Sequence, residues 1–400
     1  MIATGITVEY NPFHNGHLFH LREAKSQTGA DVIIAVMSGQ FLQRGEPAIV
    51  DKWTRTKMAL AGGADVVIEL PYAFATAHAT QFAKGAIQLL DAAGCSYFCF
   101  GSEQGSIAPF TSSLDLISQH RQIYEQTIQQ AMKEGLSYPN ALRKGYEIIS
   151  SDTSVELANL AEPNNILGFQ YMQAAREIQS SMKPVTIERT GTHYHDTELP
   201  DHPIASATSI RKSIFSPDSD DDIHSFLPAA SFQLLNDWQE QFEFQSWDKF
   251  YPLLRYTILR EGPGLLSEIA DISEGIEFAF FKAAKEQPTF QSFMQAVKSK
   301  RYTWTRIQRM LVHILTGCRA STRDKITEPA YLRLLGMSEA GRSYLQIAKK
   351  KLELPLVSRA ASLSDPSLEL DIKSTDIYMC GVRPDASLSG LDYRTPPILL

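Results

Sequence analysis

Two histidines and a glycine near the start of the chain have the types and the spacing that phosphate chemistry needs. His14, Gly16 and His17 lie in the sequence Asn-Pro-Phe-His-Asn-Gly-His at residues 11–17. An apolar run at residues 2–8 precedes them, and apolar residues at helical spacing follow. A helix N-terminus offers N–H groups and the positive end of its dipole to an anion, and glycine lets the backbone approach a ligand closely. The two imidazoles could then stabilise the charge that builds up when a phosphorus is attacked.

A second polar segment, at residues 206–211, supports such a site. It reads Ser-Ala-Thr-Ser-Ile-Arg. The hydroxyl of Thr208 and N–H groups at a helix start could hold the outer phosphates of ATP, and Arg211 could balance their charge. A cluster of Ser and Thr before a helix is also typical of an ordinary N-cap. Both interpretations remain open from the sequence.

The elements that would position these residues alternate between apolar runs and amphipathic helices. Buried strands are predicted at residues 2–8, 31–37, 65–70, 96–100 and 184–189, and helices at 17–27, 52–61, 81–93 and 166–179. This alternation predicts a Rossmann-like α/β fold, a doubly wound parallel sheet, whose ligand lies at the carboxyl ends of the strands. Turn-forming residues at 140–144, 150–154 and 162–165 predict loops on the ligand side or an insertion.

The pattern changes after about residue 215. The acidic residues 216–222 predict a linker. Beyond them, helices are predicted at residues 229–242, 247–260, 276–285, 289–298, 302–316 and 339–350. We therefore expect a nucleotide-binding domain at residues 1–215, an α-helical domain at 223–360, and a C-terminal segment at 361–400 that packs back on the first domain.

The composition, with 44% hydrophobic and 21% charged residues among 400, is typical of a globular protein. Cys95, Cys99, Cys318 and Cys380 lack the spacing of a zinc or redox motif and suit a reducing cytosol. No stretch approaches the roughly 20 apolar residues of a membrane helix, and no basic region of a signal peptide precedes the first apolar run. We expect a cytoplasmic protein without a structural metal site.

A basic segment contrasts with the overall net charge of −7. Residues 296–351 contain thirteen Lys and Arg against three Asp and Glu. At helical spacing, one face of residues 301–316 is apolar: Ile307, Met310, Leu311, Ile314 and Leu315. Basic residues fall on another face or just before the helix: Lys298, Lys300, Arg301, Arg306, Arg309 and His313.

This basic face predicts contact with RNA phosphates, and Lys298, Lys300, Arg301, Arg306 and Arg309 are the candidate RNA-binding residues. The aromatic rings of Tyr302 and Trp304 could stack on unpaired bases. A second basic cluster follows at Lys349, Lys350 and Lys351. An ordinary solvated helix face is the alternative interpretation.

The His-x-Gly-His motif after the first strand resembles the signature of the nucleotidylyltransferase superfamily, which includes class I aminoacyl-tRNA synthetases. Further segments are similar to one family within it, the bacterial tRNA(Met) cytidine acetate ligases. They are TVEYNPFHNGHLFH (7–20), SGQFLQRGEPAIVDKWTRTKMAL (38–60), GADVVIELP (63–71), FGSE (100–103), PNNILGFQY (163–171), ERTGTHYHD (188–196) and KSKRYTWTRIQR (298–309). The similarity covers nearly the whole chain, and pantetheine and nicotinate adenylyltransferases do not share the later segments.

The resemblance implies an enzyme that activates acetate with ATP, which gives acetyl-adenylate and pyrophosphate. The acetyl group would then pass to the exocyclic amine of the wobble cytidine in elongator tRNA(Met), forming N4-acetylcytidine. Because acetate itself would attack the α-phosphorus, the protein would position the reactants and neutralise charge. Mg²⁺ would be bound through ATP.

The resemblance also implies site residues, with His14 and His17 catalytic. ATP would contact Thr7, Val8, Glu9, Tyr10, Asn11, Pro12, Phe13, His14, Asn15, Gly16, His17, Leu18, Phe19, His20, Gly101, Asn165, Arg189, Thr208 and Arg211. Asn164 is an alternative to Asn165. Ala207 stands where the superfamily usually has a hydroxyl residue.

Some of these residues have a simpler interpretation. Gly101 directly follows a predicted strand, where a side chain would collide with the nucleotide or where the chain merely turns. Arg189 could hold phosphate or form a surface ion pair. Arg44, Lys52 and Arg55 could neutralise charge on substrate or RNA, or could be ordinary charges on a helix surface.

Two other functions remain in competition. A small-molecule adenylyltransferase would share His14, Gly16, His17 and Arg211, but it would leave the basic helical segment unexplained. A non-catalytic RNA-binding protein with a decayed nucleotide site is the other alternative, and the intact histidines argue against it.

Overall fold

The computed structural model describes residues 1–151, 153–189, 204–216 and 223–400. Five parallel strands form its centre: β1 (Ala3–Val8), β2 (Val32–Ser38), β3 (Val66–Leu70), β4 (Tyr97–Ser102) and β5 (Lys183–Glu188). Their order is β5-β4-β1-β2-β3, which confirms the predicted doubly wound parallel sheet. The order reverses between β1 and β4, and a crevice for a ligand opens at such a switch point. Residues 217–222 of the predicted linker and 190–196 of the similar segments lie outside the described residues.

The central strands are buried on both faces, which explains their continuous apolar sequences. In β2, Val32, Ile34 and Val36 belong to one hydrophobic core, and Ile33, Ala35 and Met37 belong to the other. Helices α4 (Ala79–Ala92) and α8 (Pro163–Glu177) contribute to the first core, whereas α1 (Asn15–Thr28) and α2 (Lys52–Ala61) cover the second. Two shorter helices complete this part of the chain. α3 (Tyr72–Ala75) follows β3, and α9 (Ala207–Ile214) lies in the described range 204–216.

The sheet continues beyond β3 with strands from the last third of the chain. β6 (Leu332–Met337) pairs antiparallel with β3, and β7 (Leu356–Val357) and β8 (Ile398–Leu399) both pair parallel with β6. β6 and β7 were not predicted within the mostly helical region at residues 223–360. β6 has only six residues, which is too short for a stable isolated helix, and its pairing covers the edge of β3.

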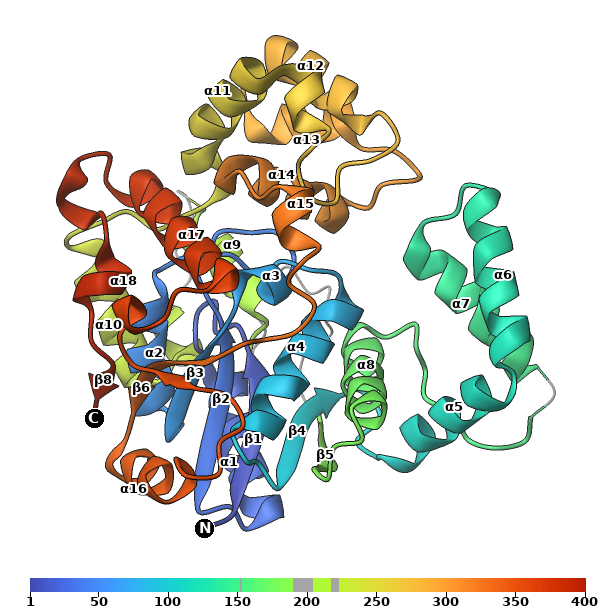
Figure 1. Ribbon diagram of the computed structural model, residues 1–400, viewed down its shortest axis with the longest axis vertical. Helices are drawn as coiled ribbons and strands as arrows, with labels where there is room; N and C mark the ends of the chain where they lie inside the picture. The colour runs from blue at the N-terminus through green and yellow to red at the C-terminus, as the bar shows by residue number, and fades with distance from the viewer. Residues whose placement is uncertain (152, 190–203, 217–222) are drawn as a thin grey trace.

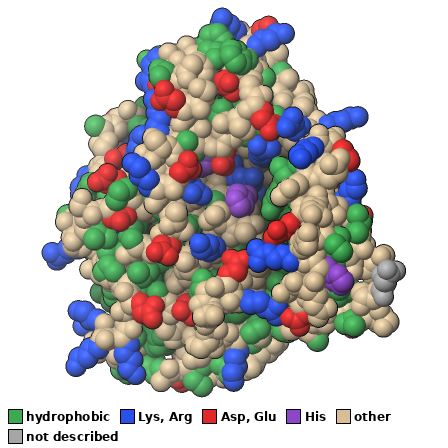
Figure 2. All heavy atoms as spheres, turned by 45° about the vertical axis from the view of Figure 1, so that its right-hand side comes forward, with side chains coloured by type: hydrophobic (Ala, Val, Ile, Leu, Met, Phe, Trp, Pro, Cys, Tyr) green, Lys and Arg blue, Asp and Glu red, His purple; other side chains and the backbone are tan. Residues whose placement is uncertain are grey.

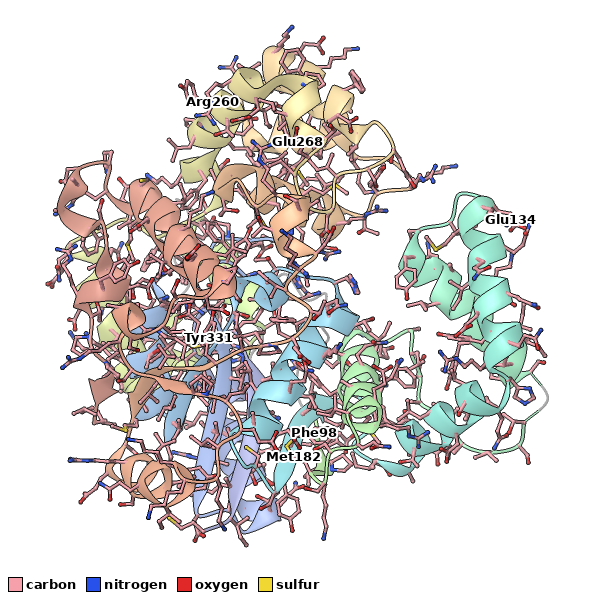
Figure 3. All side chains as sticks on the ribbon, in the orientation of Figure 1. Phe98, Glu134, Met182, Arg260, Glu268 and Tyr331 are labelled. Carbon is pink, nitrogen blue, oxygen red and sulfur yellow. The ribbon has the colours of Figure 1, made fainter. Side chains whose placement is uncertain are left out.

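An insertion between β4 and α8 projects from the sheet as α5 (Ala108–Gln119), α6 (Arg121–Lys133) and α7 (Tyr138–Ser150) (Figure 1). Glu134 lies at the end of this projection, far from Phe98 and Met182 in the sheet layer (Figure 3). Of the two alternatives predicted for residues 140–144, the insertion is correct and the loop is wrong, because these residues belong to α7; residues 162–165 are mostly the start of α8. Proline and polar residues are favourable in the first turn of a helix, so they resemble loop residues in sequence.

The remaining helices lie in the last described range, residues 223–400. They are η1 (Ile223–Phe226), α10 (Ala229–Gln239), α11 (Trp247–Leu266), α12 (Ile276–Glu286), α13 (Phe290–Val297), α14 (Trp304–Thr316), α15 (Ala320–Arg323), α16 (Glu339–Ala348), η2 (Ala360–Ser362), α17 (Pro366–Val382), η3 (Ala386–Leu388) and α18 (Leu391–Arg394). In Figure 1, α11 to α15 lie beyond the carboxyl ends of the parallel strands. Among the described helices, none combines the length and apolar character required to cross a bilayer.

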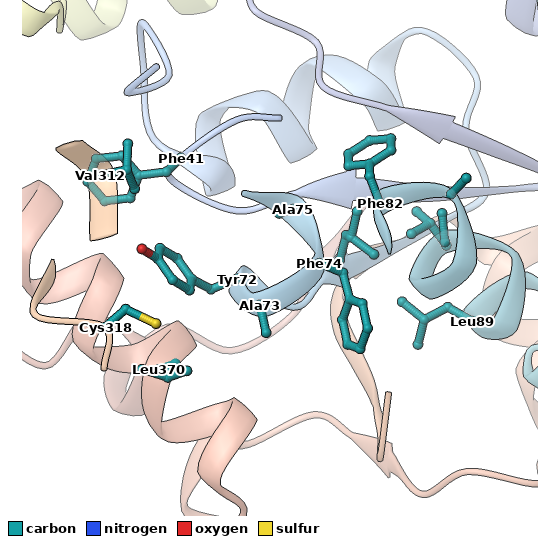
Figure 4. Close-up of a cluster of buried hydrophobic side chains, with 14 of the residues drawn as sticks. Phe41, Tyr72, Ala73, Phe74, Ala75, Phe82, Leu89, Val312, Cys318 and Leu370 are labelled. Atoms are coloured by element: carbon teal, nitrogen blue, oxygen red, sulfur yellow. The ribbon is translucent and has the colours of Figure 1, made fainter. Parts of the chain in front are cut away.

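The helical region shares a hydrophobic core with the sheet rather than standing apart from it. Tyr72 of α3 packs close to Val312 of α14, Cys318 and Leu370 of α17 (Figure 4). The Tyr72 hydroxyl is 2.8 Å from His313 Nδ1 and 2.7 Å from Thr316 Oγ1. The chain after residue 360 therefore helps to hold the helices of α11 to α15 against the sheet.

Candidate active site

A cavity of about 290 Å³ opens at the carboxyl ends of β1 and β4, where the strand order reverses. Segments that are far apart in the sequence meet in its wall. Of the predicted ATP-binding residues, the lining includes Thr7, Val8, Glu9, Tyr10, Asn11, His14, Gly16, His17, Phe19, His20, Gly101, Arg189, Thr208 and Arg211. The two polar segments singled out in the sequence therefore face the same space.

Five predicted contacts lie outside this wall. Pro12, Phe13, Asn15 and Leu18 do not line the cavity. Phe13 is fully buried, and the Asn15 amide donates to the Ser225 carbonyl at 2.9 Å. Asn165 is 1% exposed, and its Oδ1 accepts from the Glu103 N–H at 2.9 Å. The neighbouring Asn164 lines the cavity instead.

His14 and His17 lie face to face at the N-terminus of α1. Their ring centroids are 3.7 Å apart, with an angle of 29° between the rings. The Gly16 N–H donates to His14 Nδ1 at 3.1 Å, and the His14 N–H donates to His17 Nδ1 at 3.3 Å. These bonds form a capping box that fixes both rings. Because His14 Nδ1 is an acceptor, the neutral ring carries its proton on Nε2 and can donate from that atom.

The cavity keeps its histidines neutral. Burial, together with the nearby charges of Arg189 and Arg211, lowers the pKa of His14 to about 3. Burial also lowers the pKa of His17 well below its ordinary value and the pKa of His20 to about 4. Neutral imidazoles near two guanidinium groups form a site that favours an anion without holding excess charge on the rings.

The second polar segment starts α9 and turns toward the same space. Ser206 caps the helix, because its Oγ accepts from the Ser209 N–H at 3.0 Å. Arg211 Nη1 donates to the Asn11 carbonyl at 2.9 Å, and Nη2 lies 3.3 Å from Glu46 Oε2. Both interpretations of this segment therefore apply, since Ser206 is an N-cap while Thr208 and Arg211 line the cavity.

Gly101 lies within the last residues of β4, and not after the strand as predicted. A Cβ at this position would lie 3.3 Å from Arg189 Cγ and 3.9 Å from His20 Cδ2. A side chain would therefore crowd Arg189 at the cavity wall. The structure favours the space-making interpretation of this glycine over a simple turn, because residue 101 pairs with Ile187 as an ordinary strand residue.

Sequence reasoning missed part of the wall. A loop between β2 and α2 contributes Leu42, Gln43 and Glu46 beside the expected Arg44. Tyr171 of α8 also lines the cavity and forms a hydrogen bond with Thr7. These residues lie within the segments 38–60 and 163–171 that resemble the family, which was the available signal, but neither segment has the spacing of a phosphate motif.

Lys52 and Arg55 do not face substrate or solvent, so both earlier interpretations of them are wrong. Each side chain is completely buried. Lys52 Nζ lies 2.8 Å from Glu69 Oε1 and 2.9 Å from Asp392 Oδ1. Arg55 donates to the Glu9 carbonyl at 2.7 Å and to the Ser38 carbonyl at 3.0 Å. These cations stabilise the fold beneath the cavity.

The basic residues before α14 are exposed, whereas those within it are partly buried. Lys298, Lys300 and Arg301 are exposed, and Arg301 Nε lies 2.7 Å from Glu274 Oε2. The Arg306 guanidinium lies 4.6 Å from the Tyr302 ring centroid. Figure 2 turns the right-hand side of Figure 1 forward and shows a hollow on that face with Lys, Arg and His side chains around it.

Two residues of this segment differ from their prediction. Tyr302 is 7% exposed, and its hydroxyl donates to the Ser273 carbonyl at 3.0 Å, so its ring packs inward instead of presenting a stacking surface. His313 is 1% exposed and lies 3.6 Å from Asp271 Oδ2. Burial would lower the pKa of His313, but the bonds to Asp271 and Cys318 raise it to about 9. His313 is thus a buried cation and not part of a basic surface.

Comparison with known proteins identifies the family. The model of the HIGH nucleotidyl transferase family matches residues 1–389. The chain is 51% identical to a tRNA(Met) cytidine acetate ligase of Lysinibacillus sphaericus over the full length of both, and 43% identical to that of Bacillus subtilis over 94% of this chain and 92% of the relative. This chain belongs to the tRNA(Met) cytidine acetate ligase family. The resemblance seen in the sequence is confirmed.

Solved structures agree with this assignment. A crystal structure of Thermotoga maritima TmcAL without ligand covers all of both chains with a TM-score of 0.92 at 32% identity. A second crystal form, bound with α-thio ATP, has a TM-score of 0.90 at 32% identity and also covers both chains completely. The family and the nucleotide analogue in this neighbour support a nucleotide site in the cavity of the present chain.

Proposed function

We propose that this chain is an ATP-dependent ligase that forms acetyl-adenylate and transfers the acetyl group to the wobble cytidine of elongator tRNA(Met), giving N4-acetylcytidine. The observation that carries this proposal is the gathering of the His-x-Gly-His segment and the Thr208–Arg211 segment around one cavity at the switch point of the sheet. The named relatives, which align along the whole chain, support the same acceptor.

In the first step, acetate attacks the α-phosphorus of ATP. His14 and His17 face the cavity from the helix N-terminus, where hydrogen bonds from neutral rings stabilise the developing negative charge. Thr208 and Arg211 are assigned to the departing pyrophosphate, because a guanidinium and a hydroxyl match phosphate oxygens. Gly101 leaves space at the end of β4 for the nucleoside.

The same proposal also says how the metal ion and acetate are bound. Mg²⁺ would enter with ATP and would need few ligands from the protein, because this cation usually keeps several waters and binds substrate phosphates. The cavity wall fits this arrangement, because its phosphate-facing candidates are imidazoles, a hydroxyl and Arg211. In the described ranges, no three His, Cys, Asp or Glu side chains come together to hold a metal ion. Acetate binds beside the α-phosphate. The compartment that we assign to the enzyme is the cytoplasm.

RNA binding is assigned to the basic helices of the 223–360 region. Of the five candidate residues, Lys298, Lys300 and Arg301 are exposed just before α14, and Arg306 and Arg309 lie on α14. The backbone of Arg309 packs against Gly45, in the loop that also supplies Arg44 to the cavity. RNA held along this helix would therefore lie beside the acetyl-adenylate.

A direct assay tests the proposal. The protein is incubated with ATP, labelled acetate and tRNA transcripts, and label is expected in elongator tRNA(Met) only. Substituting Arg306→Ala together with Lys300→Ala should retain acetyl-adenylate formation and weaken both tRNA acetylation and the salt dependence of tRNA binding, because phosphate contacts are lost. Adenylate transfer to a phosphorylated metabolite without RNA labelling would instead indicate a small-molecule adenylyltransferase.

A further inference from the structure

Among the described residues, three carboxylates line the cavity: Glu9, Glu46 and Glu188. Glu46 and Glu188 are less suited to react with a bound substrate. Glu46 Oε2 pairs with Arg211 Nη2 at 3.3 Å, and Glu188 is exposed at the end of β5. Glu9, directly after β1, has no ion pair with another described residue. Its carboxylate is therefore the one available for chemistry.

The position of Glu9 is fixed from several directions. Its Oε1 accepts from the Gln43 N–H at 2.7 Å, which leaves Oε2 to bind another group. The buried Arg55 donates to the Glu9 carbonyl at 2.7 Å and so holds the backbone. Tyr10, the next residue, has a left-handed φ of 51°, a conformation that persists only where surrounding contacts enforce it. Such rigid placement is what a reacting group requires.

The surroundings of Glu9 also suit proton transfer. Burial raises the pKa of Glu9 above its ordinary value, while the Gln43 bond and the nearby Arg44 counteract part of this effect. A carboxylate whose pKa moves toward the working pH is a better proton acceptor than an ordinary surface glutamate.

We propose that Glu9 is the general base of the acetyl-transfer step; this rests on the proposed function. The acceptor nitrogen forms a bond to the acetyl carbon, and the bond from that carbon to the phosphate oxygen breaks. That oxygen leaves with the electron pair as AMP, and the proton on the nitrogen passes to Oε2 of Glu9. The first step needs no such base, because acetate attacks as an anion and has no proton to lose.

The experiment separates the two steps in Glu9→Gln, which retains an oxygen for the Gln43 N–H. Acetate-dependent ATP–pyrophosphate exchange is expected to fall far less than acetyl transfer, although Glu9 lies in the wall of the ATP cavity. Single-turnover transfer from enzyme-bound acetyl-adenylate to an elongator tRNA(Met) transcript is expected to fall by about 10²–10⁴-fold. The wild-type transfer rate should rise with pH along an acid limb, and Glu9→Gln should lack that limb. Glu9→Asp should recover part of it, and Glu240→Gln, on an exposed helix end, should match wild type.

Two results would overturn the role of Glu9. One is transfer by Glu9→Gln at the wild-type rate. The other is an equal loss of exchange and transfer, which would indicate that Glu9 positions ATP. If wild-type enzyme forms acetyl-adenylate but labels no RNA, the proposed function fails and the role of Glu9 fails with it.

Discussion

At the scale of single residues, His14 and His17 act as fixed neutral donors. Each ring accepts a backbone N–H through Nδ1, so its orientation is set by the first turn of α1. Burial keeps the pKa of both rings low. Their contribution to catalysis then comes from hydrogen bonds placed before the substrate arrives, and not from a permanent positive charge.

We expect His17→Ala to lower acetyl-adenylate formation by about 10²–10³-fold, the usual loss when one preorganised donor to a transition-state oxyanion is removed. Acetate-dependent ATP–pyrophosphate exchange measures this step without RNA. His120→Ala, at the exposed end of α5, is the matched control and should leave the rate unchanged. Exchange by His17→Ala near the wild-type rate would remove His17 from the proposed mechanism.

Contiguous motifs predicted segments that face the cavity, namely residues 7–20 and 206–211, although not every residue of the first segment lies in its wall. It fails for isolated charges, because the position of a lysine does not reveal what it faces. Lys52 seemed suited to substrate or solvent, yet its partners Glu69 and Asp392 lie 17 and 340 residues away in the sequence. The asparagine pair shows the same difficulty at adjacent positions, because Asn164 lines the cavity and Asn165 does not.

At the scale of elements, the loop at residues 41–47 connects the cavity to the helical region. Phe41 and Pro47 form a bridge that closes the loop, and Gln43, Arg44 and Glu46 face the cavity. The Gly45 carbonyl accepts from Trp247 Nε1 of α11 at 2.9 Å. Gly45 also adopts a φ of 72°, and a Cβ there would lie 2.3 Å from the Arg309 nitrogen of α14.

We expect Gly45→Ala to push the loop away from α14 and to weaken ATP binding as well as stability. Gly135→Ala is the matched control, because Gly135 has a φ of 89° but nothing within 4 Å of the added Cβ. The control should lose only about 1–2 kcal/mol of unfolding free energy from the left-handed conformation. Thermal unfolding and calorimetric titration with ATP measure both effects. Equal losses in the two variants, with unchanged ATP affinity, would contradict the role of the loop.

Elements with strong periodicity were predicted correctly, including all five parallel strands and the helices α1, α2, α4 and α8, but the helices α5 to α7 after β4 were not predicted. β6 was missed because its apolar run lies among helices, and a short apolar run fits either structure until its partner is known. Its partner β3 lies more than half the chain away. Residues 140–144 resemble a loop in sequence because residue types that favour turns are also common near the start of a helix, and these residues lie in the first half of α7.

At the scale of the whole molecule, a buried charge network joins distant parts of the chain. Lys52 of α2 contacts Glu69 of β3 and Asp392 of α18, and Arg333 of β6 lies 3.6 Å from Asp392. Two positive and two negative groups balance one another away from water. Removing one partner from such a network leaves an uncompensated buried charge.

We therefore expect Asp392→Ala to lower the free energy of unfolding by about 3–5 kcal/mol. Chemical denaturation followed by circular dichroism measures the change. Glu125→Ala is the comparison, because it removes an exposed pair with Arg121, and it should lower the free energy of unfolding far less, since solvent screens exposed pairs. A loss in Asp392→Ala as small as in Glu125→Ala would show that the network does not stabilise the fold.

The strands next to β3 come from the end of the chain, and this has a consequence for synthesis on the ribosome. β6 covers the edge of β3, and β8 pairs with β6, only after residues 332–399 have been translated. Until then, the nascent chain carries an apolar strand edge that another chain could pair with. The N-terminal half thus depends on late residues for protection, so a premature stop codon before β6 should yield aggregating fragments.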